Sequence, residues 1–267
     1  MDIVRRALGE QRVGHLGTLD PFAKGLLVLV VGRATRLAPF AADWPKTYEG
    51  VIRLGVTTAT DDVTGAVIAT APWTQITPAQ LADVIASFRG GYEQRPPAYS
   101  AVKIEGERAY RRARRGEVVA PEPRAVEIRE LEILEAAVPD LRFRATVSAG
   151  TYLRSLARDI GAKLACGAHL AALQRTAVGP FRLADAVAPE GVGPARLQDA
   201  AVLVAQMPRR QLDKKEREAV VHGRPIPGNR EAESGTRVAL FAGDELVAVA
   251  EQAGDLLKPR VVVAVES

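Results

Sequence analysis

Residues 13–31 read Val13-Gly14-His15-Leu16-Gly17-Thr18-Leu19-Asp20-Pro21-Phe22-Ala23-Lys24-Gly25-Leu26-Leu27-Val28-Leu29-Val30-Val31. Gly14 and Gly17 can adopt a positive φ or allow another backbone to approach closely, and Pro21 pushes Asp20 out of the helical region. The aspartate is therefore expected to project from a tight loop. The apolar run after it predicts a strand that is buried on both faces. Asp20 either caps the segment that follows it or is a reactive acid that the loop holds rigidly.

Composition limits the class of protein. The chain has 267 residues, of which 47% are hydrophobic and 25% are charged, enough for one large core or a core plus a small domain. It lacks both an apolar run of the roughly 18 residues that span a bilayer and a signal-peptide core, which predicts a cytoplasmic protein without a membrane segment. The single cysteine excludes an intrachain disulfide and a cysteine-based zinc site. No metal is predicted, because no metal-ligand spacing relates the histidines, which are His15, His169 and His222.

Periodicity predicts a mixed α and β chain. Thr77 and Pro78 supply an N-cap and a first-turn proline for a helix over 78–89, and a helical period runs from Tyr152 to Leu164. Proline and glycine clusters at 188–194 and 224–235 mark loops or boundaries. Strands are predicted at 51–55, 126–134 and 141–147, and in the tail at 237–241, 245–250 and 260–265.

Basic residues are concentrated in one segment. The net charge is 36 minus 32, or +4. Between positions 103 and 115, six basic residues oppose Glu105 and Glu107, so this segment alone has an excess of four positive charges. Such a run is either a solvated helix face or, with Tyr99 and Tyr110 beside it, a surface for RNA phosphates and unstacked bases. The basic residues are Lys103, Arg108, Arg111, Arg112, Arg114 and Arg115.

Four ordered motifs resemble those of the TruB family of tRNA pseudouridine synthases. The first is the Asp20 segment. The others are Lys46-Thr47-Tyr48-Glu49-Gly50 with Thr58-Ala59-Thr60-Asp61-Asp62, then Pro97-Ala98-Tyr99-Ser100-Ala101-Val102-Lys103, and Gly150-Thr151-Tyr152-Leu153-Arg154-Ser155-Leu156-Ala157-Arg158-Asp159-Ile160-Gly161. The resemblance is strong from Asp2 to Arg175. Ala59 departs from it, since many members have a second acid there, whereas Asp62 is retained.

The resemblance implies an α+β fold with a mixed, mainly antiparallel sheet and flanking helices. It implies a catalytic domain over 1–205, with a basic RNA-binding insertion over about 99–123 that is mobile in bacterial members and closes over the RNA arm. The tail over 206–267 resembles a PUA domain, a small β module that binds RNA. Members normally have a strand and turn before the position of Asp2, so we expect the natural protein to begin upstream of Met1 and to be more stable and more active with that segment.

The implied reaction turns uridine into pseudouridine in tRNA, at uridine 55 of the T arm, without a cofactor. Asp20 would act as a nucleophile or as an acid-base group, and the residues leave both routes open. Arg154 would pair with Asp20 and keep it ionised, although a surface ion pair is the alternative for this arginine. Tyr48 would stack on the base and Tyr152 would line its pocket, or both are core residues.

The remaining site residues concern the RNA. His15 would brace the space that the extruded base leaves, and Leu173 would touch the substrate unless it is simply core. The RNA contacts of the insertion are assigned to Lys103, Arg111, Arg112, Arg114 and Arg115. The sequence thus predicts a monomeric enzyme with tRNA as its partner. A guide-RNA-dependent synthase subunit and a non-catalytic RNA-binding or tRNA-folding protein remain open.

Overall fold

The computed structural model describes residues 1–100, 102–104, 106–115, 117 and 119–264. Its residues fall into two compact units. Unit 1 contains Met1–Gly17, Val28–Ala42 and Val187–Ser267, and unit 2 contains Thr18–Leu27 and Asp43–Ala186. These limits differ from the boundary expected at 205/206, because two N-terminal segments group with the tail. The assignment of catalysis to 1–205 and of a PUA-like role to 206–267 stays a prediction.

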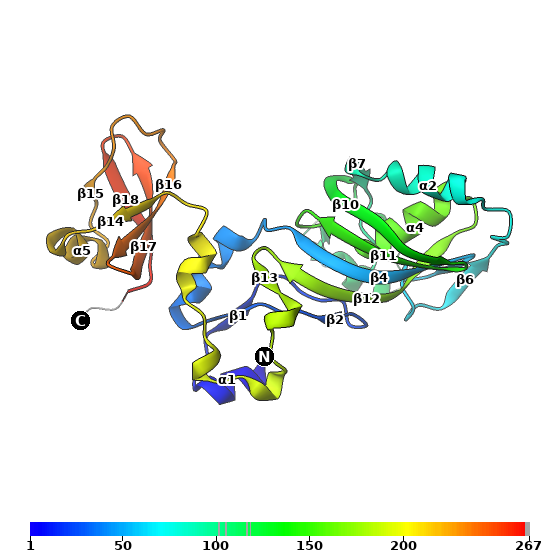
Figure 1. The fold of residues 1–267 in the computed structure, drawn as a ribbon, viewed down its shortest axis with the longest axis horizontal. Coiled ribbons are helices and arrows are strands. Elements are labelled where there is room, and N and C mark those ends of the chain that lie inside the picture. The colour runs from blue at the N-terminus through cyan, green and yellow to red at the C-terminus, as the bar shows by residue number, and fades with distance from the viewer. Residues whose placement is uncertain (101, 105, 116, 118, 265–267) are drawn as a thin grey trace. The chain divides into compact units, whose positions relative to one another are not determined.

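Unit 2 is built on a mainly antiparallel sheet (Figure 1), as expected for the α+β class. In the part of the chain that the structure describes, seven strands form it, in the order β13-β12-β4-β11-β10-β7 with β2 parallel to β12. Their bounds are β2 Lys24–Gly25, β4 Lys46–Leu54, β7 Gly90–Gln94, β10 Arg124–Ala137, β11 Asp140–Val147, β12 Ala168–Val178 and β13 Phe181–Arg182.

Strand β4 shows why the sheet has one buried and one polar face. Ile52 and Leu54 are buried in the core, whereas Arg53 between them pairs with Asp140 on the other face. This alternation follows from the two-residue period of a strand. Core residues Leu156 and Ile160 come from helix α4 (Leu153–Lys163), and α2 (Pro78–Ala86) covers the same core.

Helix α2 confirms the predicted start. Thr77 accepts from the backbone N–H of Gln80, while the Gln80 side chain accepts from the N–H of Thr77, which is a complete capping box. The helix ends at Ala86, a few residues before the predicted end at Arg89. Unit 2 also contains β5 Val56–Thr58, β6 Val67–Thr70, β8 Lys103–Ile104, β9 Glu107–Arg108, α3 Ala109–Arg114 and η2 Leu183–Asp185.

Unit 1 contains a second sheet, with the order β14-β16-β17-β18-β15. The first two strands predicted for the tail are confirmed. The bounds predicted for the third strand, 260–265, are wrong, because the strand is Leu256–Val262 and starts just after the turn at Gly254. Val265 lies outside the described residues. The elements of unit 1 are α1 Asp2–Leu8, β1 Val13–His15, β3 Leu29–Val31, η1 Gly32–Ala41, η3 Pro189–Gly191, η4 Pro194–Arg196, η5 Ala200–Val204, β14 Arg209–Gln211, α5 Lys214–Val221, β15 Ile226–Pro227, β16 Arg237–Ala242, β17 Glu245–Ala253 and β18 Leu256–Val262.

The apolar run after Asp20 is not one strand buried on both faces, so that prediction is wrong. Lys24–Gly25 pairs with β12, whereas Leu29–Val31 pairs with β1 in the other unit. Between them the side chains alternate: Leu26 and Val28 are buried, and Leu27 is 39% exposed. The extended backbone places successive side chains on opposite sides, so an unbroken run of apolar residues still leaves one side open to solvent.

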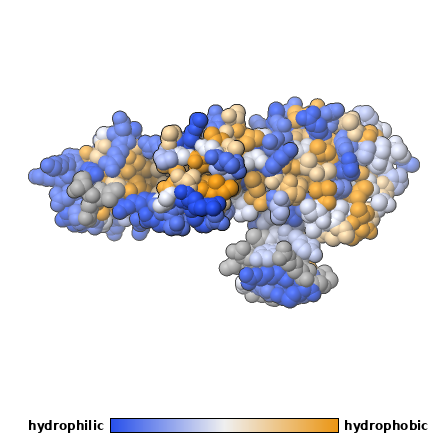
Figure 2. All heavy atoms as spheres, turned by 90° about the horizontal axis from the view of Figure 1, so that it is seen from below, coloured by the Kyte–Doolittle hydropathy of each residue, from blue (hydrophilic) through white to orange (hydrophobic). Residues whose placement is uncertain are grey.

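The surface gives no sign of a membrane-spanning helix. Within the residues described above, every helix is too short or too polar to cross a bilayer. Figure 2 shows hydrophilic and hydrophobic side chains next to one another over the face seen from below.

Candidate active site

The Asp20 loop is a turn that proline stabilises. The backbone N–H of Ala23 donates to the carbonyl of Asp20 at 2.9 Å, and Pro21 occupies the second position of this four-residue turn, where its fixed φ is favourable. Asp20 therefore lies in a turn outside any helix or strand, as the sequence predicted.

Arg175 holds both ends of this loop. It lies on β12, is fully buried, and donates from Nε to the carbonyl of Leu26 at 2.8 Å and from Nη1 to the carbonyl of Thr18 at 3.4 Å. Gly25 has a φ of 102°, and a Cβ there would lie 2.4 Å from the Arg175 carbonyl oxygen. Only glycine allows this approach, so Gly25 and Arg175 together fix the loop against the sheet.

The predicted pair of Arg154 and Asp20 is present. Arg154 Nη2 lies 2.8 Å from Asp20 Oδ1, and Nε lies 3.1 Å from Oδ2. This is a two-point contact between a planar guanidinium and a carboxylate, which fixes orientation as well as distance. The Arg154 side chain is 6% exposed and that of Asp20 is 28% exposed. The carboxylate is therefore held from the protein side and remains accessible from the other.

Asp62 supports Arg154 from behind. Its Oδ2 lies 3.5 Å from Arg154 Nη1, and both side chains are buried. Its other oxygen, Oδ1, accepts from the Thr60 hydroxyl at 2.7 Å and from the backbone N–H and hydroxyl of Thr64 at 2.9 and 2.5 Å. Arg154 Nη1 also donates to the Thr60 carbonyl at 3.2 Å. The loop over 58–64 thus holds the guanidinium with a carboxylate and a carbonyl.

Tyr48 and Leu173 lie on neighbouring strands of the same core. Tyr48 is on β4 and Leu173 on β12, and both are buried. Burial raises the pKa of the Tyr48 phenol, and the Asp20 carboxylate adds to that effect, while the charge and hydrogen bond of Arg175 oppose it. Tyr48 is therefore a protonated phenol near both Asp20 and Arg175 at neutral pH, and its predicted stacking role stays a prediction, as does the substrate contact of Leu173.

Tyr152 immediately precedes α4. Its backbone N–H donates to Gln94 Oε1 at 2.8 Å, and the Gln94 amide donates back to the Tyr152 carbonyl at 3.1 Å. The Arg124 guanidinium lies 5.1 Å from the centre of the Tyr152 ring, a cation–π distance. These contacts hold Tyr152, the N-cap of α4, so that the helix starts at Leu153, one residue before Arg154.

The other predicted residues belong to other elements. His15 is an exposed residue of β1 in unit 1. Arg111, Arg112 and Arg115 lie on and just after α3, where Arg112 pairs with Glu117 and Arg115 pairs with Glu107 and Glu117. The side chains of Lys103 and Arg114 lie outside the part of the chain that the structure describes.

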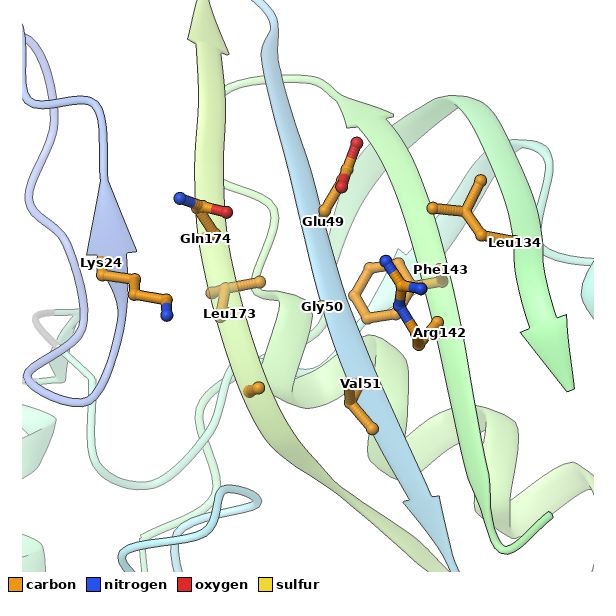
Figure 3. A pocket seen from close by; sticks show the side chains of 10 residues that line it. Lys24, Glu49, Gly50, Val51, Leu134, Arg142, Phe143, Leu173 and Gln174 are labelled. Atoms are coloured by element: carbon orange, nitrogen blue, oxygen red, sulfur yellow. The ribbon is translucent and has the colours of Figure 1, made fainter. Parts of the chain in front are cut away.

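A hollow of about 270 Å³ lies on the polar face of the sheet (Figure 3). Glu49 and Val51 of β4 line it together with Lys24, Arg142 and Gln174. Because these β4 residues alternate with the core residues Tyr48 and Ile52, the hollow faces away from α4. Its lining includes Leu173 but neither Asp20 nor Arg154, so it does not mark the Asp20 carboxylate.

The cluster can hold a single carboxylate with fixed orientation beside a neutral phenol. Among the side chains described by the structure, no group of three or more histidine, cysteine, aspartate or glutamate residues is arranged as a metal site. Sequence reasoning missed Arg175, because a buried arginine in a strand has no periodic signal; the glycine at position 25, which requires a close neighbour, was the one available hint.

Comparisons with known proteins identify the family of the chain. Residues 5–153 match the model of the TruB family pseudouridylate synthase N-terminal domain, and residues 154–214 match that of the tRNA pseudouridylate synthase B C-terminal domain. A protein of Azoarcus sp. (strain BH72) named tRNA pseudouridine synthase B is 40% identical over 100% of this chain and 90% of its own length. One of the same name from Thermobifida fusca (strain YX) is 42% identical over 98% of this chain and 92% of its own length.

Solved structures have the same fold. A chain of a Cbf5-Nop10-Gar1 complex superposes with a TM-score of 0.69 at 26% identity, covering 99% of this chain and 78% of that one. A chain of an H/ACA RNP bound to a substrate RNA containing 2'-deoxyuridine superposes with a TM-score of 0.70 at 22% identity, covering 97% of this chain and 78% of that one. With both family models matched in order and relatives about two-fifths identical along nearly its whole length, the chain belongs to the TruB family of pseudouridylate synthases.

Proposed function

We propose that this protein isomerises uridine to pseudouridine in tRNA, at uridine 55 of the T arm, without a cofactor. The observation that carries the proposal is the carboxylate of Asp20, gripped at two points by the buried Arg154 and accessible from the other side. Membership of the TruB family and the names of its relatives support the same reaction.

The reaction sets the demands on the site. The bond between C1′ and N1 breaks, the base turns, a bond forms between C1′ and C5, and a proton moves from C5 to N1, so no electrons are gained or lost overall. A carboxylate must attack or deprotonate the sugar or base, which is the role of Asp20. Tyr48 and Tyr152 retain the detached base, and Leu173 contacts it. His15 fills the space from which the uridine is extruded.

Arg154 orients the acid. A two-point contact leaves one orientation for the carboxylate, and preorganised geometry of this kind contributes strongly to rate. The Asp62 carboxylate and the Thr60 carbonyl in turn hold the guanidinium.

The insertion contacts the phosphates of the T arm. Lys103, Arg111, Arg112, Arg114 and Arg115 provide the positive charges, and the cation–phosphate term makes binding depend on salt. The protein acts as a cytoplasmic monomer with tRNA as its partner. Small PUA-like modules bind RNA, and residues 206–267 have that role here.

A guide-RNA-dependent synthase subunit is the second candidate, because the structural matches include chains from Cbf5-Nop10-Gar1 and H/ACA RNP structures. Relatives about 40% identical that are named tRNA pseudouridine synthase B favour an enzyme that acts without guide RNA or partner proteins. Activity on bare tRNA transcript, without guide RNA or other proteins, separates the two.

The decisive experiment compares wild type, Asp20→Asn and Asp43→Asn with an unmodified tRNA transcript, followed by mapping of pseudouridine. Asp43 is an exposed acid of the same unit and controls for loss of one negative charge. We expect modification at position 55 by wild type and Asp43→Asn, and none by Asp20→Asn, whose affinity for tRNA stays within a few-fold because the change is nearly isosteric. Substantial turnover by Asp20→Asn would refute the role of this acid.

A further inference from the structure

The two ends of the segment that contains the basic insertion (about 99–123) meet in the sheet. Gln94 at the end of β7 pairs with Arg124 at the start of β10 in the sheet ladder. The chain between these partners, residues 95–123, therefore leaves and returns at one point. That point adjoins Tyr152, through the paired hydrogen bonds of Gln94 and the contact of Arg124 with the Tyr152 ring.

The outgoing end of the insertion is fastened to α4. The carbonyl of Arg95 accepts from the hydroxyl of Ser155 at 2.9 Å and from Nη2 of Arg158 at 2.8 Å. Four residues further on, the carbonyl of Tyr99 accepts from Nη2 of Arg154 at 3.2 Å. That nitrogen is the one that lies 2.8 Å from Asp20 Oδ1, so the two N–H bonds of one amino group serve the insertion and the candidate reacting acid.

The returning end is tied to the same residues. Nη1 of Arg95 donates to the carbonyl of Pro121 at 3.2 Å, which joins the two ends of the insertion across its base. Arg95 therefore connects both ends of the insertion to the first turns of α4, the helix that contains Arg154.

Arg158 connects this base to the loop behind Arg154. Its Nη1 lies 3.0 Å from Asp61 Oδ2, while Nη2 donates to Arg95; Asp159 accepts from the same guanidinium at 2.9 Å. Asp61 precedes Asp62, the buried partner of Arg154. One guanidinium thus links the insertion, the helix and the loop that together orient Arg154.

We propose that Arg158 is a positioning residue that couples the seating of the insertion on RNA to the orientation of the Arg154–Asp20 pair. This proposal rests on the proposed function. When the insertion is correctly placed, the Tyr99 carbonyl holds one N–H bond of Arg154 Nη2 while the other points at Asp20. When the insertion is displaced, that hold is lost, and the rigid guanidinium shifts relative to the Asp20 carboxylate. Misplacement of a reacting group by about 1 Å can reduce the rate about 100-fold, so the coupling acts on the chemical step more than on affinity.

The first test separates rate from affinity. Wild type, Arg158→Gln and Arg158→Lys are compared in single-turnover reactions at saturating unmodified tRNA, with the dissociation constant measured by filter binding. Arg89→Gln is the matched control, because Arg89 likewise donates to a backbone carbonyl, that of Leu131 in β10, away from the insertion. We expect Arg158→Gln to lower the rate about tenfold or more with an affinity within about threefold of wild type.

The control and the conservative variant define the outcome. Arg89→Gln should match wild type. Arg158→Lys should recover part of the rate, because lysine keeps the charge, but its N–H bonds share one nitrogen and cannot span the acceptors that Arg158 reaches from three nitrogens. A wild-type rate for Arg158→Gln overturns the proposal. If Arg158→Gln fails to fold, Ser155→Ala replaces it, because alanine is favourable in a helix interior and the substitution removes one of the two donors to the Arg95 carbonyl. An unchanged rate for Ser155→Ala also overturns the proposal.

The second test measures the coupling directly. Arg111→Gln is combined with Arg158→Gln, and the effects on the single-turnover rate are compared. Coupling predicts that Arg111→Gln lowers the rate in wild type and lowers it no further in Arg158→Gln. Independent effects, or no effect of Arg111→Gln on the rate in wild type, contradict it.

A readout without turnover keeps this inference distinct from the proposed function. The amide of Tyr110 donates to the carbonyl of Ser100 within the insertion, and we expect its hydrogen exchange to accelerate in Arg158→Gln and not in Arg89→Gln. Unchanged exchange contradicts the anchoring. Absence of pseudouridine with wild type instead refutes the proposed function alone.

Discussion

Asp62→Asn tests whether burial or distance determines the strength of the ion pairs in this protein. Asp62 approaches Arg154 only to 3.5 Å, but both side chains are 6% exposed. Asp140 approaches Arg53 to 2.6 Å and makes two hydrogen bonds, yet those side chains are 35% and 48% exposed. The same substitution at the two aspartates therefore removes a long buried pair in one case and a short exposed pair in the other.

The expected magnitudes differ several-fold. Removing one partner of a buried pair costs about 3–5 kcal/mol. At position 62 the new amide nitrogen also faces the N–H groups of Arg154, while the remaining oxygen still accepts from Thr64, so we take about 3 kcal/mol. The exposed pair contributes about 0.2–1 kcal/mol. With about 2–4 °C of Tm per kcal/mol for a unit of this size, Asp62→Asn should lower Tm by about 6–12 °C and Asp140→Asn by less than about 4 °C.

Thermal unfolding by circular dichroism measures the stability difference, and single-turnover pseudouridine formation measures its effect on the site. Asp62→Asn should reduce the rate about tenfold or more, because Arg154 loses the carboxylate that holds it behind Asp20, whereas Asp140→Asn should leave the rate unchanged. Equal changes in Tm for the two variants would refute the argument from burial. A wild-type rate for Asp62→Asn would refute the argument from positioning.

Two further predictions concern the insertion and α4. Arg111→Gln should reduce the slope of log affinity for tRNA against log salt, measured by binding titrations, by up to about one. Arg115→Gln should reduce that slope less, because Arg115 already contacts two carboxylates. The reverse order would show that the ion pairs of Arg115 open when RNA binds. Gly161→Ala should lower Tm, because a Cβ at position 161 would lie 2.2 Å from the backbone nitrogen of Ala168. This clash should outweigh the preference of about 1 kcal/mol for alanine over glycine in a helix. A rise in Tm would contradict the prediction.

The sequence was sufficient where a local pattern determines structure. The alternation around Leu131 and Phe143 predicted β10 and β11, and the capping residues at Thr77 predicted the start of α2. The pairing of Asp20 with Arg154 was also foreseen, although 134 positions separate them, because both positions match motifs of one family and the pairing does not depend on periodicity.

The structure was needed where contacts between residues distant in sequence determine the fold. Strand β12 was not predicted: its buried residues include Arg175, whose guanidinium is satisfied by carbonyls of the Asp20 loop. A charged side chain in a buried position conceals the alternation that identifies a strand. The charge excess counted over 103–115 was likewise incomplete, since Glu117 lies two positions beyond that window and neutralises Arg112 and Arg115.

The division of the chain affects how it can be shortened. The ten residues Thr18–Leu27 belong to unit 2, but the chain on either side of them belongs to unit 1. In unit 1, Arg33 donates to the carbonyl of Ala264 and Arg36 to that of Val262. Deleting the tail as a detachable module would leave these N-terminal segments without the surface that they pack against. Because the same segments are joined directly to the Asp20 loop, a truncation meant to remove only the tail would also loosen the anchors of Asp20.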